Sequence, residues 1–372
     1  MLFPDGKTRF LYPDHFKNLV IAGDGSTGKV IAENVNSFDA ECSSKNGTEV
    51  FISTDHGTLL YISHDGERLL SRTMMTAKNV KSKIREVNVI EINGRYHVFY
   101  CLDCERRYLI HQIVSDGDFC EPAVIDSIGR HFAYSIAKDE ECNIHIVYET
   151  DSRLKYRKYA YSQKNFTAPL PLFEGEVGKT AVGSWQDNVY VAFTEPGRQV
   201  CRLFLARVSD TPSKKLIMSA DKDSDISLNC MKEGIVVHVT AGGVCYEIES
   251  DYSLNVKKPK SIGKSYGICR IRSSLKNNTV RSFPVNRAGI PRDGYANFSS
   301  QISESSGAFA LKGDEIVKFA QEHKKAFGDK LWEVINEDII LRLARIEDSV
   351  AKLTACVEEN LSEIKNEETP SS

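Results

Sequence analysis

Two short segments contain residue types whose spacing could support phosphate or metal chemistry. The segment GDGSTGK (Gly23–Lys29) has the glycines and the lysine of a phosphate-binding loop. Such a loop needs Ser or Thr after the lysine to hold magnesium and a helix whose amides face the phosphates, whereas here Val30 begins a strand-like apolar run. The sequence therefore predicts a hairpin turn at this segment.

The pair Cys101 and Cys104 has the C-x-x-C spacing of zinc and redox sites. A structural zinc site needs four ligands, and the sequence holds no second C-x-x-C or H-x-x-x-H pair, although His111 or Cys120 could complete a more distant set. We therefore predict no metal and no cofactor. Four other cysteines in or beside strand-like runs are predicted to lie in the core: Cys142, Cys201, Cys245 and Cys269.

A short β-strand pattern recurs along the chain at intervals of 44 to 48 residues. Each copy follows a turn and ends in an aromatic or aliphatic residue. The copies are Glu49–Ile52, His97–Tyr100, His145–Tyr148, Tyr190–Phe193, Val236–Val239 and Val280–Phe283, with a further match at Arg9–Tyr12. A second apolar run follows most copies and ends in a Ser- and Asp-rich turn, which is the pattern of a β-hairpin.

A period near 45 residues that holds about four strands is typical of one blade of a β-propeller. Residues 7–305 contain no stretch with helical periodicity, which excludes arrays of helical repeats. We predict an all-β propeller over residues 1–311 with seven four-stranded blades, or alternatively six, and with the two ends of the propeller sharing one blade. The blade repeats are predicted near residues 7–35, 36–83, 84–130, 131–177, 178–223, 224–264 and 265–311.

Four basic or imidazole side chains near the starts of repeats are the candidate binding residues. Arg130 and His131 lie in a connection that enters the innermost strand of a blade, so we expect them to face the central channel. Arg270 and Arg272 lie near the start of the last repeat. His97 and His145 occupy equivalent positions in consecutive repeats, where an imidazole hydrogen-bonded between strands accounts for them without a paired site. No catalytic residue is predicted.

The segment STDHGTLL (Ser53–Leu60) resembles the Asp-box of sialidase-type propellers, a Ser-x-Asp-x-Gly turn that closes with an aromatic residue. Leu60 replaces the aromatic residue, and the resemblance covers only this segment. Sialidases clamp a carboxylate with three arginines and use a Tyr/Glu pair and a further acid for the chemistry. The resemblance implies a propeller fold, and it assigns no arginine of this chain, such as Arg85 or Arg130, to those roles.

Helical periodicity replaces the strand pattern from Gly313 onward. Residues 312–329 are predicted to form a docking helix, and residues 330–366 a coiled-coil helix with apolar residues at alternating steps of four and three. The seam consists of Ile339, Leu343, Ile346, Val350, Leu353, Val357, Asn360 and Ile364. The seam predicts a homo-oligomer. The alternative is a single amphipathic helix packed on its own domain. Residues 367–372 are predicted to be disordered.

The overall composition indicates a protein that binds neither nucleic acid nor membranes. The formal net charge is −3, and no stretch reaches the roughly 18 apolar residues that a membrane span requires. The N-terminus has no export signal, so the ten cysteines are expected to be reduced and the protein cytoplasmic.

Because the sequence holds no strong nucleophile, metal or phosphate motif, we expect a non-enzymatic scaffold. Its propeller face would bind an unknown protein or glycan, and the C-terminal helix would multiply that face. A sialidase-like glycoside hydrolase or lyase acting in the funnel is the first alternative. A structural component of a larger assembly is the second.

Overall fold

The computed structural model describes residues 9–23, 28–43, 47–65, 68–77, 82–209, 211–221, 224–264, 268–273 and 279–284, the last two segments by their backbone pairing. The chain divides into two compact units, residues 1–311 and 312–372. Every regular element of the described residues is a β-strand, which confirms the all-β prediction. None of these elements is a helix long and apolar enough to cross a membrane.

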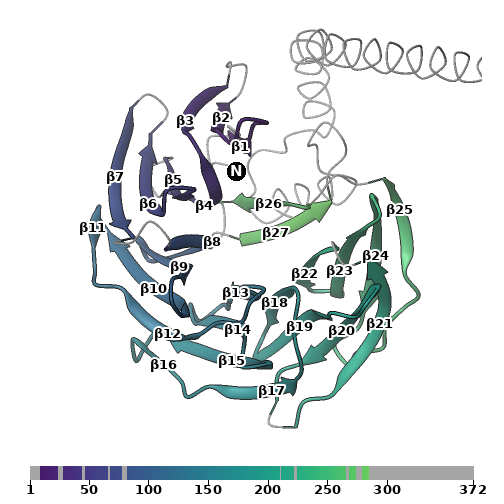
Figure 1. Ribbon diagram of the computed structural model, residues 1–372. Coiled ribbons are helices and arrows are strands. Elements are labelled where there is room, and N and C mark those ends of the chain that lie inside the picture. The colour runs from purple at the N-terminus through teal and green to yellow at the C-terminus, as the bar shows by residue number, and fades with distance from the viewer. Residues whose placement is uncertain are drawn as a thin grey trace, which may run out of the picture. The chain divides into compact units, whose positions relative to one another are not determined.

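Five antiparallel sheets of four or five strands follow one another along the chain (Figure 1). The first contains β4 (Val35–Cys42), β5 (Thr48–Thr54), β6 (Thr58–His64) and β7 (Leu69–Thr76). The second contains β8 (Lys83–Ile92), β9 (Arg95–Asp103), β10 (Arg107–Ser115), β11 (Asp118–Phe119) and β12 (Ala123–Ser127). The third contains β13 (Tyr134–Lys138), β14 (Ile144–Thr150), β15 (Arg153–Ala160), β16 (Asn165–Phe166) and β17 (Leu170–Glu174).

The last two of these sheets have four strands each. One contains β18 (Thr180–Trp185), β19 (Asn188–Glu195), β20 (Val200–Arg207) and β21 (Lys214–Asp221). The other contains β22 (Asp225–Met231), β23 (Gly234–Ala241), β24 (Val244–Ser250) and β25 (Lys260–Lys264). Strands pair in chain order, and in the five-stranded sheets two short strands share the outer position beside β10 or β15. First strands of consecutive sheets contact each other, so the sheets follow a ring.

Two smaller sheets complete the described residues. One contains β1 (Arg9–Pro13), β2 (Leu19–Gly23) and β3 (Lys29–Ala32), and the other β26 (Ile268–Ser273) and β27 (Thr279–Pro284). Strands β2 and β3 are antiparallel partners, as expected for a hairpin at Gly23–Lys29.

The two smaller sheets lie on the same side of the sheet β4–β7. Strand β26 contacts both β4 and β22, and the apolar side chains of β2 and β3 pack with Ala40, Val50 and Ile52. The other face of that sheet, with Phe51 and Leu59, packs against β8 and β9. The first and last repeats therefore share one position in the ring, which matches the six-blade alternative and corrects the preferred count of seven.

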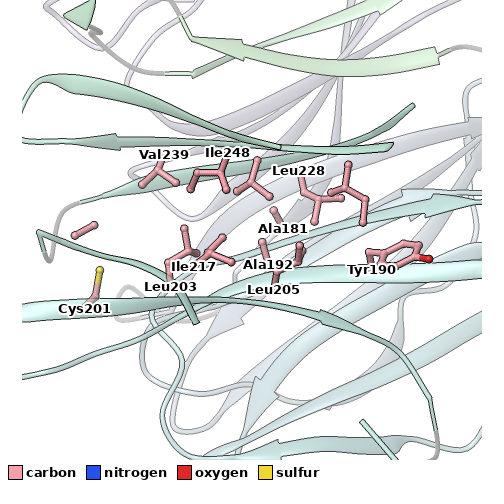
Figure 2. Close-up of a cluster of buried hydrophobic side chains, with 13 residues drawn as sticks. Ala181, Tyr190, Ala192, Cys201, Leu203, Leu205, Ile217, Leu228, Val239 and Ile248 are labelled. Atoms are coloured by element: carbon pink, nitrogen blue, oxygen red, sulfur yellow. The ribbon is translucent and has the colours of Figure 1, made fainter. Parts of the chain in front are cut away.

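The core consists of layers between the faces of consecutive sheets. Between the sheets β18–β21 and β22–β25, side chains such as Leu203 and Leu205 point toward Val239 and Ile248 (Figure 2). All four of these side chains are fully buried. The second strand of each of the five larger sheets is covered on both faces, so it appears in the sequence as a continuous apolar run. Five of the recurring copies found in the sequence are these second strands, β5, β9, β14, β19 and β23, and a sixth lies on β27.

Hydrogen bonds from side chains join the first strands of two neighbouring sheets. Alternate residues of β4 lie on one face of the strand and accept hydrogen bonds from alternate backbone amides of β8. The donor–acceptor pairs are Val87–Ser37 (2.6 Å), Val89–Asp39 (2.9 Å) and Glu91–Glu41 (3.3 Å). The constant register shows that the two strands run parallel, so the N-terminal ends of the first strands gather at one end of the ring.

One five-residue turn, Asp-x-x-x-Asn, occurs three times among the residues that the structure describes. In each copy the aspartate carboxylate accepts hydrogen bonds from the backbone and side-chain amides of the asparagine, and the fourth residue has a positive φ. The copies are Asp14–Asn18, Asp139–Asn143 and Asp251–Asn255, with φ of 63° at Lys17, 65° at Cys142 and 64° at Leu254. The carboxylate replaces missing backbone partners and fixes the hairpin.

Candidate functional site

A polar cavity of about 900 Å³ lies along the first strands of the five larger sheets. Its wall comes from β4, β8, β13, β18 and β22, together with the connections that enter and leave them. We call the end formed by the N-terminal ends of these strands the entry end. Its lining residues are Glu86, His131, Phe132, Gly178, Lys179 and Asp225. The opposite end, the turn end, is lined by Asn93, Asp139, Glu140, Cys142, Trp185 and Gln186.

Acidic groups outnumber basic groups in the described wall. The carboxylates are Asp39, Glu41, Glu86, Glu91, Asp139, Glu140 and Asp225, and the basic side chains are Lys138, Lys179 and His131. The backbone amide of Val89 donates to Asp39, and that of Glu91 donates to Glu41. The composition of the described wall is therefore less suited to anionic ligands than to neutral or cationic ones.

Most of the charged groups at the wall have structural partners. Lys179 lies 3.3 Å from Asp225, and Lys138 donates to the carbonyl of Glu91 at 3.0 Å. Burial raises the pKa of Asp139, but hydrogen bonds from His145 and Asn143 together outweigh this effect and lower the pKa to about 2. By contrast, no described residue forms a hydrogen bond or ion pair with the carboxylate of Glu86 or of Glu140. One such acid lies at each end of the cavity.

The backbone at Glu86 projects its side chain from the entry end. Glu86 has a φ of 50° at a β-bulge, where the pairing of β8 with β9 shifts between Arg85 and Asn88. Tyr134 donates its hydroxyl to the Glu86 carbonyl and so holds the bulge. A positive φ is costly for a residue with a Cβ and recurs at sites where a side chain must be re-aimed. Phe132 enters the next first strand in the same way, with a φ of 51°.

The structure brings the two predicted residues Arg130 and His131 together with Glu176. Arg130 Nε lies 2.5 Å from Oε1 of Glu176, and His131 Nε2 lies 3.4 Å from the same oxygen. Arg130 also donates to His131 Nε2 at 3.1 Å. His131 lines the cavity, as predicted, whereas Arg130 lies behind it and orients it through this cluster.

Phe132, the next residue, lies between two arginines at the entry end. The guanidinium carbons of Arg85 and Arg107 lie 5.4 Å and 5.6 Å from its ring centroid. Both arginines are also paired with Asp103, at 3.2 Å and 3.4 Å. The ring is therefore held in one orientation at the cavity wall by cation–π contacts.

The side chains of the other predicted site residues lie outside the described part of the structure. Arg270 and Arg272 lie on β26, opposite Ser282 and Val280, so their backbone belongs to the strand pair that contacts β4 and β22. The eight seam residues from Ile339 to Ile364 lie outside the described residues. Oligomerisation through them therefore stays a prediction.

The arrangement implied by the sialidase resemblance is not assembled in the described part of the cavity. No arginine is among its described lining residues. Arg85 is paired with Asp103, and Arg130 with Glu176. Tyr134 is the tyrosine nearest the entry end. Its hydroxyl group donates to the carbonyls of Glu86 and Phe99.

The cysteine and histidine pairs singled out in the sequence have packing roles. Cys101 is buried beside half-buried Cys104, and no group of metal-binding side chains occurs among the described residues. His97 stacks on His111, with Nδ1 3.0 Å from Nε2 of its partner. His145 bonds to Tyr156 at 2.8 Å and to Asp139 at 3.0 Å. Cys201 and Cys245 are buried and Cys142 is half-buried, while the Cys269 side chain lies outside the description.

No protein-family model matches the sequence, and no curated protein matches it. Among solved structures, the fucose-binding lectin of Aleuria aurantia in complex with Fucα1-6GlcNAc is 14% identical with a TM-score of 0.47, over 72% of this chain and 96% of that one. AofleA from Arthrobotrys oligospora is 12% identical with a TM-score of 0.46, over 76% and 84% of the two chains. An α-L-arabinanase of Cellvibrio cellulosa is 9% identical with a TM-score of 0.37, over 61% and 95%.

One structure of the Aleuria lectin is described as a six-bladed β-propeller. The ring of antiparallel sheets, each with its first strand at a central cavity, is the architecture of such propellers in its own right. The described residues form a β-propeller. The chain resembles propeller proteins without matching any one family.

Sequence reasoning missed the two acids that complete the entry end. Glu86 directly follows Arg85, which the sequence did single out, and the bulge that projects Glu86 has no clear signature in one sequence. Glu176 lies 45 residues after His131, and only the fold shows that they meet. The Asp-x-x-x-Asn spacing marks three turns, one of them at the cavity, but it also occurs inside β22 at Asp225–Asn229, so the spacing alone does not predict a turn.

Proposed function

We propose that this propeller is a glycan-binding module whose ligand enters the central cavity at the entry end. The observation that supports this most is the unpartnered carboxylate of Glu86. It lies at the rim of a polar cavity together with His131, Phe132, Lys179 and Asp225. The cavity is large enough for a small saccharide.

The chemistry of the rim suits a neutral sugar. Sugar hydroxyls donate hydrogen bonds to carboxylates such as Glu86 and accept them from an ammonium group such as Lys179. The apolar C–H face of a sugar ring packs on an aromatic ring, which Phe132 offers at the wall. The excess of carboxylates repels sialic acids, sugar phosphates and nucleotides. We therefore propose uncharged or amine-bearing glycans as the ligand class.

We further propose that the C-terminal helix multiplies this site in the cytoplasm. The heptad spacing of residues 339–364 supports oligomerisation, and several copies of a weak site increase avidity without new contacts. The eight described cysteines are all free thiols, which supports a reducing compartment. Binding rather than catalysis is proposed because the acids of the described wall are held by structural partners or stand alone.

A binding assay with a matched pair of variants tests the site. The full chain is passed over immobilised neutral, amine-bearing and acidic glycans, and affinities are measured for any that bind. A hydrogen bond to a charged group contributes roughly 1.5–3 kcal/mol, so Glu86→Gln should weaken binding about tenfold or more. Glu140→Gln is the control, because Glu140 is also exposed and unpartnered but lies at the turn end, and we expect less than a twofold effect.

Two results would contradict the proposal. The first is that no glycan binds the folded chain. The second is that Glu140→Gln weakens binding as much as Glu86→Gln, which would move the ligand away from the entry end.

A further inference from the structure

A buried carboxylate lies directly beneath the loop that forms part of the entry end. Glu149 is the penultimate residue of β14 and is 3% exposed. Its Oε2 atom has no hydrogen-bond partner in the described structure. This oxygen is pressed against the backbone of Gly129, where a Cβ would lie 1.4 Å from it. Only glycine at this position leaves space for the carboxylate.

The backbone of Glu149 is coupled to the same loop, residues 128–133, which we call the entry loop. The Gly129 amide donates to the Glu149 carbonyl at 2.8 Å, and the Glu149 amide donates to the Ala133 carbonyl at 2.9 Å. The entry loop presents His131 and Phe132 to the cavity. A change at the Glu149 side chain therefore acts on the residues that line the proposed site.

In the next sheet, β18–β21, an uncharged residue occupies the position that corresponds to Glu149. There Thr194 follows the copy Tyr190–Phe193, as Glu149 follows His145–Tyr148. The Gly178 amide donates to the Thr194 carbonyl at 2.9 Å, and the Lys179 amide donates to the Thr194 hydroxyl at the same distance. The position needs only a small neutral acceptor, so the fold does not require an acid at Glu149.

The charges around Glu149 make its neutral form the better fit. Burial raises the pKa of the carboxyl group, and the amide of Ser152 opposes that rise. Glu176 and Asp151, on the connections that follow β17 and β14, raise the pKa further, and Arg130 on the entry loop lowers it. An ionised Glu149 leaves a buried oxygen charged and without a donor, which costs free energy.

We propose that Glu149 is a proton-sensitive latch: neutral, it holds the entry loop in the described conformation, and ionised, it loosens the loop and weakens ligand binding. This regulation rests on the proposed function for its consequence, whereas the movement of the latch does not. An acid with a raised pKa stabilises the closed loop at low pH and loses that stabilisation as pH rises through the raised value. The site should therefore release its ligand on alkalinisation.

Hydrogen exchange of the full chain without ligand tests the latch. We expect protection of residues 128–133, corrected for the intrinsic exchange rate, to fall clearly between pH 5 and pH 8, because the carboxyl group with the raised pKa ionises as pH rises. In Glu149→Gln and in Glu149→Thr, which copies the next sheet, protection should not change with pH. His131→Gln should retain the dependence, because the proposed latch is the Glu149 carboxyl group and does not require the His131 side chain.

The results separate this proposal from the proposed function. Equal pH dependence in the wild-type chain and in both Glu149 variants would overturn the latch, and so would loss of the dependence in His131→Gln alone. A pH-dependent loop in a protein that binds no glycan would leave the latch standing and overturn the glycan site. Glycan binding by a protein whose entry loop does not respond to pH would leave the glycan site standing and overturn the latch.

Discussion

At the scale of single residues, the interior holds several ionisable groups that are neutral because they are buried. His97 and His111 stack on each other and contact Tyr159, and His111 also contacts Phe99 and Phe166. Burial lowers the pKa of His97 to about 4 and that of His111 to about 3. An unfolded chain binds protons at these histidines near pH 6.5, so the folded state excludes protons that the unfolded state accepts.

This pair predicts a loss of stability in mild acid. The folded pKa of each base is depressed, so stability is complete above pH 6.5 and falls as pH decreases toward 4. The slope is about 1.4 kcal/mol per pH unit for each imidazole. Urea denaturation measures the free energy of unfolding at pH 7 and at pH 5. The decrease in this free energy from pH 7 to pH 5 should be clearly smaller for His111→Phe than for the wild-type chain. His15→Gln, which changes an exposed histidine, is the control. An equally large decrease in the free energy of unfolding in His111→Phe and in the wild type would contradict the role given to the buried histidine pair.

At the scale of elements, the Asp-x-x-x-Asn turns fix hairpins by replacing backbone hydrogen bonds with side-chain ones. Asn143 is 5% exposed and bonds to Asp139 through both its backbone and its side chain. Asn255 makes the same bonds to Asp251 in an exposed turn. Burial is therefore the main difference between two copies of one motif.

Removing the asparagine side chain should have unequal effects in these two turns. Asn143→Ala leaves buried polar groups without partners and should destabilise the fold by about 1–3 kcal/mol, whereas water can replace the lost bonds in Asn255→Ala, for which we expect under about 1 kcal/mol. Thermal denaturation of both variants measures the difference. Equal losses would show that the turn acts only locally and not through its burial.

The strands that could be predicted from the sequence are those whose side chains are buried on both faces of the sheet. Second strands such as β9 and β14 are buried on both faces, so their copies His97–Tyr100 and His145–Tyr148 stand out as apolar runs. First strands such as β8 and β13 have one edge at the polar cavity, and their composition is mixed. The strands that build the site were therefore the hardest to recognise.

The candidate site was predictable only in part for a related reason. The entry loop is short, and its place before a first strand pointed to His131, which lines the cavity; a binding role for His131 stays a prediction. The residues that follow the five other copies are Ser53, Cys101, Thr194, Thr240 and Pro284. Glu149 is the one acid at this position, so it was a signal in the repeat itself. The meeting of Glu176 with His131 depends on the stacking of blades, which one sequence does not encode as a local pattern.

At the scale of the whole molecule, the propeller and the C-terminal seam are proposed to make separate contributions to binding. The described part of the ring contains the polar cavity, and the seam of residues 339–364 is predicted to bring several chains together. A single amphipathic helix would give a monomer of 41.7 kDa instead. The number of chains therefore distinguishes the two readings of the tail.

Light scattering coupled to size exclusion tests this prediction in the full chain. At about 10 µM the wild-type chain should elute as an oligomer, because a coiled-coil seam of this length associates through its a and d positions. Leu353→Asp places a charge in the seam and should give a monomer. Ala355→Asp changes a position outside the predicted seam and should remain oligomeric. A wild-type monomer would contradict the oligomerisation proposal and leave the propeller site untouched.

The central claim is that one ligand site lies on the axis of the ring rather than between its blades. Isothermal titration of the full chain with a neutral or amine-bearing oligosaccharide that it binds measures this directly. The axial cavity predicts a stoichiometry of one ligand per chain, with heat of binding strongly reduced in Glu86→Gln. A stoichiometry of several ligands per chain that is insensitive to Glu86→Gln would place binding between the blades and contradict the account.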